Sequence, residues 1–173
     1  MMRKKNKKMA MWILFVCVLF LGMYKIQAFA KFKQKSEYQI SEELKGKEVK
    51  QLTFDEKKKI GEYFITAQLS VFEIQDKEEI KKIGMEIFSE DHIESGYGQL
   101  IRNYYPNRFH TLEYKFSNEE ICEESDESFT YCAIAYVSGI ENGKRDEMSL
   151  NYEMKIVKEK HTFKIAEQRQ YVE

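Results

Sequence analysis

Proline, glycine, cysteine and histidine are all scarce in this sequence. One proline and eight glycines among 173 residues, with 43% hydrophobic residues, indicate a single compact domain and exclude a disordered or collagen-like chain. The three histidines, His92, His110 and His161, lack metal-ligand spacing, and the sequence has no glycine-rich phosphate loop and no recognisable Ser/His/Asp arrangement. The sequence therefore predicts no catalytic residue, no metal site and no cofactor.

A large excess of charge of one sign is also missing, because 28 basic residues nearly balance 29 acidic ones. The balance is uneven along the chain. Residues 1–30 contain six basic residues and no acidic one, so residues 31–173 carry 22 basic and 29 acidic residues. An acidic domain is repelled by the phosphate backbone. We therefore expect no nucleic-acid binding by this larger part of the chain.

The basic tail at residues 1–8 precedes a strongly apolar segment, residues 9–30, whose only charged residue is Lys25. As a helix this segment is long enough to cross a membrane, and the basic tail should stay in the cytoplasm. We predict a single-pass membrane anchor that places the rest of the chain outside the cytoplasm. The alternative is a cleaved secretory signal, because Ala28-Phe29-Ala30 has the small-x-small spacing of a cleavage site, and the product would then be secreted.

Residues 31–52 are polar and lysine-rich, which predicts a stalk between the anchor and an exported domain at residues 53–173. Thr53 and Glu56 form a capping-box signature at the start of this domain. Apolar residues at helical spacing then continue to Val71, which predicts a long amphipathic helix.

Two shorter helices are expected before the only proline. Asp76 is a cap for the first of them, and Ser89 or Asp91 is a cap for the second, which runs toward Tyr104. Pro106 then closes the helical half of the domain, because proline cannot continue a helix.

Beyond the proline, apolar residues alternate with polar ones and predict four strands, near residues 112–116, 129–137, 148–156 and 163–171. Asn142-Gly143 is the strongest hairpin signal, because a type I′ turn needs positive φ at both central positions. This turn sets Val137 opposite Met148 and brings apolar residues together along the whole pair.

The small residues Ala133 and Ala135 leave room for the long helix to lie across the sheet, with Ile60 and Phe64 facing it. Helices followed by an antiparallel sheet define an α+β fold.

The fourth strand allows two arrangements. A turn at Glu159-Lys160 would point Glu167 and Arg169 inward beside Tyr152, at the open end of a cavity in the cone formed by sheet and helices. A β-bulge would instead turn both charged residues to solvent, and we favour it because buried charges are costly without partners.

Cys122 and Cys132 are the only cysteines beyond residue 30, and they flank a polar stretch centred on Glu127. A hairpin there places the two cysteines directly opposite each other, which suggests a disulfide in an exported domain. Two ordinary thiols are the alternative.

Four aromatic residues gather where the helices give way to the sheet: Tyr97, Tyr104, Tyr105 and Phe109. Aromatic clusters with a polar end are typical of protein interfaces, so we consider them a candidate interface. Packing in the core is the alternative explanation.

The layout as a whole resembles the nuclear transport factor 2-like fold, a bent antiparallel sheet wrapped around a long helix. The resemblance rests on a basic tail, one span, a stalk, a helix reading Phe54-Asp55-Glu56 through Phe72, two shorter helices and four strands. Membrane-anchored versions of this fold are similar to the inner scaffold subunit of bacterial type IV secretion and conjugation systems.

The resemblance implies a scaffold that is not an enzyme and that binds copies of itself and other secretion-channel subunits. An exported small-ligand-binding or envelope accessory protein is the alternative. The fold also serves enzymes, but those need an acid or histidine base in the cone, where only Glu167 is a candidate.

Overall fold

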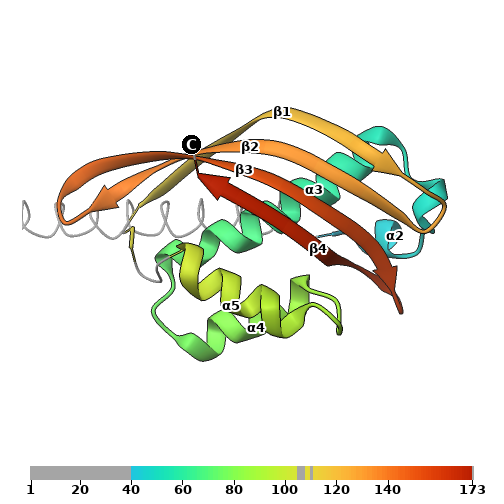
Figure 1. Cartoon of the computed structure of the whole chain (residues 1–173), viewed down its shortest axis with the longest axis horizontal. Coiled ribbons are helices and arrows are strands. Elements are labelled where there is room, and N and C mark those ends of the chain that lie inside the picture. The colour runs from blue at the N-terminus through green and yellow to red at the C-terminus, as the bar shows by residue number, and fades with distance from the viewer. Residues whose placement is uncertain (1–39, 105–107, 110, 173) are drawn as a thin grey trace, which may run out of the picture. The chain divides into compact units, whose positions relative to one another are not determined.

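The computed structural model describes residues 40–104, 108–109 and 111–172 (Figure 1). The predicted basic tail and membrane anchor, residues 1–30, lie outside this range, as do residues 31–39 of the predicted stalk. Among the described residues, no helix is both long enough and apolar enough to cross a membrane.

The predicted stalk is too long at its carboxyl end, because residues 40–52 belong to the folded unit that begins at Ile40. This segment forms a short helix, α2 (Glu42–Lys45), and a 3-10 turn, η1 (Val49–Gln51). Ile40, Val49 and Leu52 are buried in the hydrophobic core. Three widely spaced apolar residues in a lysine-rich segment thus attach it to the domain, which the average polarity of the segment concealed.

Three longer helices follow, and the sequence predicted each of them: α3 (Phe54–Leu69), α4 (Lys77–Ile87) and α5 (Ile93–Tyr104). The capping box of Thr53 and Glu56 forms as predicted, with hydrogen bonds in both directions. A 3-10 turn, η2 (Ser70–Glu73), continues the chain beyond α3 and buries Val71.

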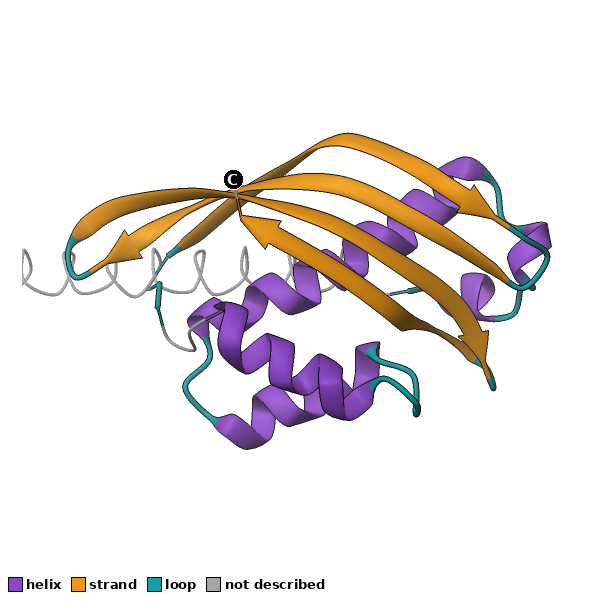
Figure 2. Cartoon of the chain, in the orientation of Figure 1, coloured by secondary structure: helices purple, strands orange, loops and turns teal. Residues whose placement is uncertain are grey.

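Four antiparallel strands form one sheet in the order β1-β2-β3-β4, and Figure 2 shows how strongly it bends. The strands are β1 (Leu112–Glu124), β2 (Ser128–Glu141), β3 (Lys144–Glu159) and β4 (Thr162–Val172). The predicted hairpin register is confirmed along its whole length, from Val137 opposite Met148 to Phe129 opposite Ile156. Asn142 and Gly143 both have positive φ, as a type I′ turn requires.

The turn between β3 and β4 lies one residue later than predicted. Glu159 pairs with Thr162, so the turn residues are Lys160 and His161, and Lys160 has a φ of 59°. A register shift follows, because Ile156 pairs with Ile165 while Lys155 pairs with Glu167, which leaves Ala166 as an extra residue. This register shift is the β-bulge that the sequence favoured for the fourth strand.

The helices α3, α4 and α5 all cover the same face of the sheet (Figure 1). Ile60 and Phe64 of α3 are fully buried, and Ala133 and Ala135 are buried in the middle of the facing strand. Gly61 allows the closest approach, because a Cβ atom added there would lie only 2.3 Å from the ring of Tyr131. The prediction that the long helix lies across the sheet is confirmed, and the close approach that the structure shows is at Tyr131, two residues before Ala133.

The close approach of Gly61 to Tyr131 predicts that one added methyl group at position 61 destabilises the fold. Gly61→Ala should lower the free energy of unfolding by about 1–3 kcal/mol, because overpacking forces the ring or the helix to move. Gly98→Ala on α5 is the matched control, since nothing lies within 4 Å of an added Cβ there. The control should raise stability by about 0.5–1 kcal/mol through helix propensity. Urea unfolding checks both, and equal stability of the two variants would contradict the packing argument.

Candidate functional site

The inside of the cone contains a buried network of tyrosine and glutamine side chains. The hydroxyls of Tyr104 and Tyr152 lie 2.6 Å apart. The Tyr104 hydroxyl also donates to Oε1 of Gln68 at 3.1 Å and accepts from Nε2 of Gln170 at 2.9 Å. Burial raises the pKa of both tyrosines, so both keep their protons at neutral pH.

One hydrogen-bond acceptor of this network has no partner among the described residues. Nε2 of Gln168 donates to Gln68 at 2.8 Å, but Oε1 of Gln168 is buried without a hydrogen-bond partner. An amide oxygen accepts hydrogen bonds, so Oε1 of Gln168 suits a small neutral donor such as water or a hydroxyl group.

Of the three residues that the cavity arrangement placed inside the cone, only Tyr152 lies there. Glu167 and Arg169 are exposed, because the bulge at Ala166 turns them to the opposite face of the sheet. There Lys155 donates to Glu167 at 3.0 Å, and Arg169 lies 3.6 Å from Glu153. On this face, water and the exposed ionic partners stabilise both charges. The interior of the cone would leave the charges without such partners.

The predicted aromatic interface is wrong for two of its members. Tyr104 and Phe109 are almost completely buried, and each packs its ring against Phe72 at a centroid distance of 5.1 Å. Tyr97 is half-buried beside Gly84 of α4, and Tyr105 lies outside the described residues. The Tyr104 hydroxyl finds its partners inside the protein, which explains why an amphipathic ring lies in the core.

Cys122 and Cys132 form a disulfide. They are not directly opposite each other, because Cys132 pairs with Glu120 and Cys122 occupies a register shift between Ile121 and Glu123. The bond therefore joins the bulged end of β1 to β2 across a diagonal.

Removing this bond should destabilise the protein. The disulfide closes a loop with a sequence separation of ten residues, and a chain-entropy treatment of such a loop gives about 3 kcal/mol. Replacing both cysteines with serine should lower the free energy of unfolding by about that amount. Urea unfolding with and without reductant checks this, because the unaltered protein should respond to the reductant and the double variant should not. A reductant effect in the double variant would show that another group is responsible.

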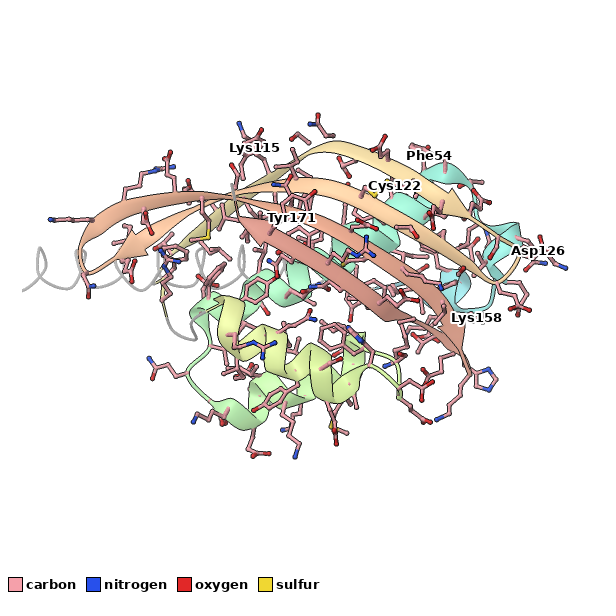
Figure 3. All side chains as sticks on the ribbon, in the orientation of Figure 1. Phe54, Lys115, Cys122, Asp126, Lys158 and Tyr171 are labelled. Carbon is pink, nitrogen blue, oxygen red and sulfur yellow. A yellow bond between two sulfur atoms is a disulfide. The ribbon has the colours of Figure 1, made fainter. Side chains whose placement is uncertain are left out.

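The outer face of the sheet is not covered by any helix in the described part of the chain (Figure 1). The register brings six uncharged side chains together near its centre, in two adjacent rows across the strands. We call this group the outer patch: Ser117, Ile134, Tyr136, Ser149, Asn151 and Tyr171. Tyr136 is 41% exposed and Tyr171 is 58% exposed. Figure 3 labels Tyr171 on β4, and Lys115 and Cys122 on β1.

Charged residues of both signs surround the outer patch. The neighbouring outer-face positions hold three basic and four acidic residues, namely Lys115, Arg145, Arg169, Glu113, Glu120, Glu147 and Glu153. Within the patch, Nδ2 of Asn151 and Oγ of Ser117 are buried and have no hydrogen-bond partner among the described residues. An uncharged centre with a charged rim is the usual anatomy of a protein interface. Sequence reasoning missed this group because alternation alone does not say which polar positions line up across strands.

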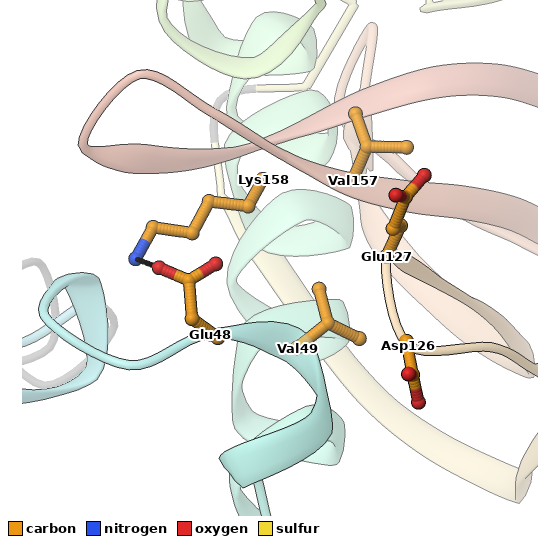
Figure 4. A pocket seen from close by; sticks show the side chains of 6 residues that line it. All are labelled: Glu48, Val49, Asp126, Glu127, Val157 and Lys158. Atoms are coloured by element: carbon orange, nitrogen blue, oxygen red, sulfur yellow. Dashed lines mark hydrogen bonds and ion pairs between the residues drawn. The ribbon is translucent and has the colours of Figure 1, made fainter.

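A depression of about 240 Å³ lies beside the β1–β2 turn (Figure 4). Val49 and Val157 line it together with three carboxylates, those of Glu48, Asp126 and Glu127. Lys158 also lines it and lies 3.1 Å from Glu48. No group of three or more His, Cys, Asp or Glu side chains within the described residues is arranged to hold a metal ion.

Comparisons with known proteins find similarity in the solved structures alone. No family model matches the sequence, and no match is found among curated proteins. A hexachlorocyclohexane dehydrochlorinase, LinA-type3 from Novosphingobium barchaimii LL02, is 10% identical with a TM-score of 0.47, over 63% of this chain and 81% of that one. A protein from Novosphingobium aromaticivorans DSM 12444 assigned as a scytalone dehydratase is 13% identical with a TM-score of 0.47, over 65% and 80%.

An IcmL-like type IV secretion system protein from Legionella pneumophila is 10% identical with a TM-score of 0.48, over 62% of this chain and 88% of that one. These likenesses concern the fold. They agree with the predicted resemblance, a bent antiparallel sheet wrapped around a long helix.

The expectation that this chain is not an enzyme is corrected by the same comparisons. Hexachlorocyclohexane dehydrochlorinases and a protein assigned as a scytalone dehydratase are among the similar structures, beside the secretion protein. The lack of a recognisable catalytic motif in the sequence is therefore no ground for excluding catalysis.

Proposed function

We propose that this protein is a membrane-anchored assembly subunit of a secretion or conjugation apparatus, with residues 9–30 as its anchor and its folded domain outside the cytoplasm. The outer patch is its binding surface, for a second copy of the chain and for other subunits. The uncharged centre and charged rim of this uncovered face carry the proposal.

Two exposed tyrosines of the outer patch support protein binding. Tyr136 and Tyr171 are aromatic side chains that lose little conformational entropy when a partner covers them. Covering their rings also removes apolar surface from water, which favours association.

The composition of the rim favours a second copy of the chain as one partner. In a two-fold symmetric contact the same surface meets itself, so each charge needs an opposite charge on the same patch. The seven rim residues carry both signs, three basic and four acidic. A rim of one sign would instead repel its own copy.

Tyr171→Glu tests this interface. The variant places a charge within the outer patch and should weaken self-association of the full-length protein in detergent at least tenfold, about 1.4 kcal/mol. Met85→Glu is the matched control, because Met85 is 56% exposed on helix α4 and lies away from the outer face. Sedimentation measures both, and circular dichroism confirms folding. Equal association of Tyr171→Glu and the unaltered protein would refute the interface.

The unpaired oxygen of Gln168 supports a second candidate function, binding of a small neutral ligand inside the cone. A ligand that binds only the folded state raises the melting temperature. Small alcohols and amides that fit should therefore stabilise the unaltered protein and leave Gln168→Leu unaffected. Stabilisation of both proteins would place such a ligand elsewhere.

A further inference from the structure

Strand β1 lies at one border of the sheet, and charged and apolar side chains alternate along its first half. The strand order β1-β2-β3-β4 gives it one side that pairs with β2 and one side that faces away from the sheet. Glu113 and Lys115 are exposed on the outer face, whereas Leu112, Tyr114 and Phe116 are half-buried on the inner face. Edge strands are the places where a strand of another chain can be added to a sheet.

Helix α3 leaves the inner face of this half of β1. It meets β1 near the strand's far end, where the ammonium group of Lys58 lies 3.5 Å from Glu119. Toward its own carboxyl end the helix reaches the opposite border of the sheet, where Gln168 of β4 donates to Gln68 at 2.8 Å. The helix thus crosses the sheet diagonally (Figure 1), away from residues 112–116, whose apolar side chains stay partly exposed.

The backbone of β1 shows which residues direct their N–H and C=O groups away from β2. Ile140 of β2 donates its N–H to the carbonyl of Thr111 at 3.3 Å, so Thr111 faces β2. Successive residues of a strand direct these groups to opposite sides, so Leu112, Tyr114 and Phe116 direct theirs toward the border of the sheet. Hydrogen-bonding groups and apolar surface therefore coincide at the same residues of this edge.

A second copy of β1, antiparallel to the first and related to it by a two-fold axis at Tyr114, matches both faces of this half-strand. On the outer face, Glu113 lies opposite Lys115 of the second copy, and Lys115 lies opposite its Glu113. On the inner face, Leu112 and Phe116 face each other in the same reciprocal way. Opposite charges and apolar side chains at directly facing positions stabilise a pair of strands.

Other registers of the same pairing fail. A two-fold axis at Glu113 or at Lys115 would place like charges directly opposite each other. An axis farther along β1 would run into a bulge, because the register with β2 shifts between Ser117 and Glu120 and Asn118 has a φ of 51° there. A bulge bends its strand, so regular pairing with a second copy ends before this point.

We propose that strand β1 pairs with β1 of a second copy of this chain over residues 112–116, with the two-fold axis at Tyr114. The four-stranded sheets of the two copies then become one continuous sheet. Because this axis is perpendicular to the sheet, the outer patches of both copies face the same way and are not covered by the contact. The edge contact is distinct from the outer patch and does not depend on the function proposed for it.

Cysteine cross-linking of the full-length protein in detergent tests this contact. Glu113→Cys combined with Lys115→Cys places sulfur atoms opposite each other across the axis, in a pair with about 4.5 Å between the Cα atoms, which permits a disulfide. Both positions are exposed, so these substitutions leave the core intact. Cys17→Ser is added to every protein, and Cys122 and Cys132 are bonded to each other, so only the new cysteines are free thiols. Mild oxidation should then give a covalent dimer.

Each single cysteine variant is a matched control. The same position on the second copy lies on a diagonal, about 7–8 Å away, which is too far for a disulfide. On a non-reducing gel the double variant should therefore give at least about tenfold more dimer than either single variant. Absence of dimer from the double variant, or equal amounts from a single variant, would overturn the edge contact.

Exchange of the two charges is a second measurement. Glu113→Lys sets like charges opposite each other and should weaken self-association about tenfold, whereas adding Lys115→Glu restores opposite charges and should recover it. Both proteins lose the ion pair of Glu113 with Arg145, so that loss does not explain a difference between them. Sedimentation measures both, and association that stays weak in the exchanged variant would contradict the register.

The Tyr171→Glu variant separates the edge contact from the outer patch. It changes β4 and leaves β1 unaltered, so the pair of cysteines should cross-link in this background as well. Loss of the cross-link there would overturn an edge contact that is independent of the outer patch. A cross-link that persists, together with unchanged sedimentation of Tyr171→Glu, would refute the outer patch and support the edge contact.

Discussion

The contact between the ring of Tyr131 and helix α3 determines how closely the helical layer lies on the sheet. The ring occupies the space that any side chain at position 61 would need, so only glycine permits this distance. Ile60, Phe64 and Ile65 are then fully buried. The same tyrosine uses its hydroxyl to hold Glu119, and through it the bulged strand β1. One side chain therefore joins helix, central strand and edge strand.

The sequence predicted those parts of the fold that depend on neighbouring residues. The turn at Asn142-Gly143 determines the pairing of β2 with β3 along its whole length, because alternation and turn geometry agree there. The capping box at Thr53 likewise involves residues three positions apart. The parts that failed depend on distant contacts. Tyr104 is buried because Gln68, Tyr152 and Gln170 surround its hydroxyl, and these residues come from three other elements.

The candidate sites were harder to predict for a related reason. A β-bulge inserts one residue and reverses which side chains face inward, yet no residue type marks its position reliably. The bulge at Ala166 sends Glu167 and Arg169 out of the cone, and the bulge at Asn118 brings Glu119 in. The outer patch requires the register of three strand pairs before its members can be placed together. Periodicity indicated the faces of the strands, but only the β2–β3 hairpin had a turn signal that also determined the alignment.

The carboxyl end of β1 depends more on side chains than on its backbone ladder. Two register shifts fall between Ser117 and Glu123, and each removes regular pairing from an edge strand. The Cys122–Cys132 disulfide and the ion pair of the buried Lys57 with Glu124 offset that loss. A disulfide depends on oxidising conditions and an ion pair depends on ionic strength, whereas a backbone ladder depends on neither. The stability of this edge is therefore expected to respond to redox conditions and salt more than the stability of the inner strands does.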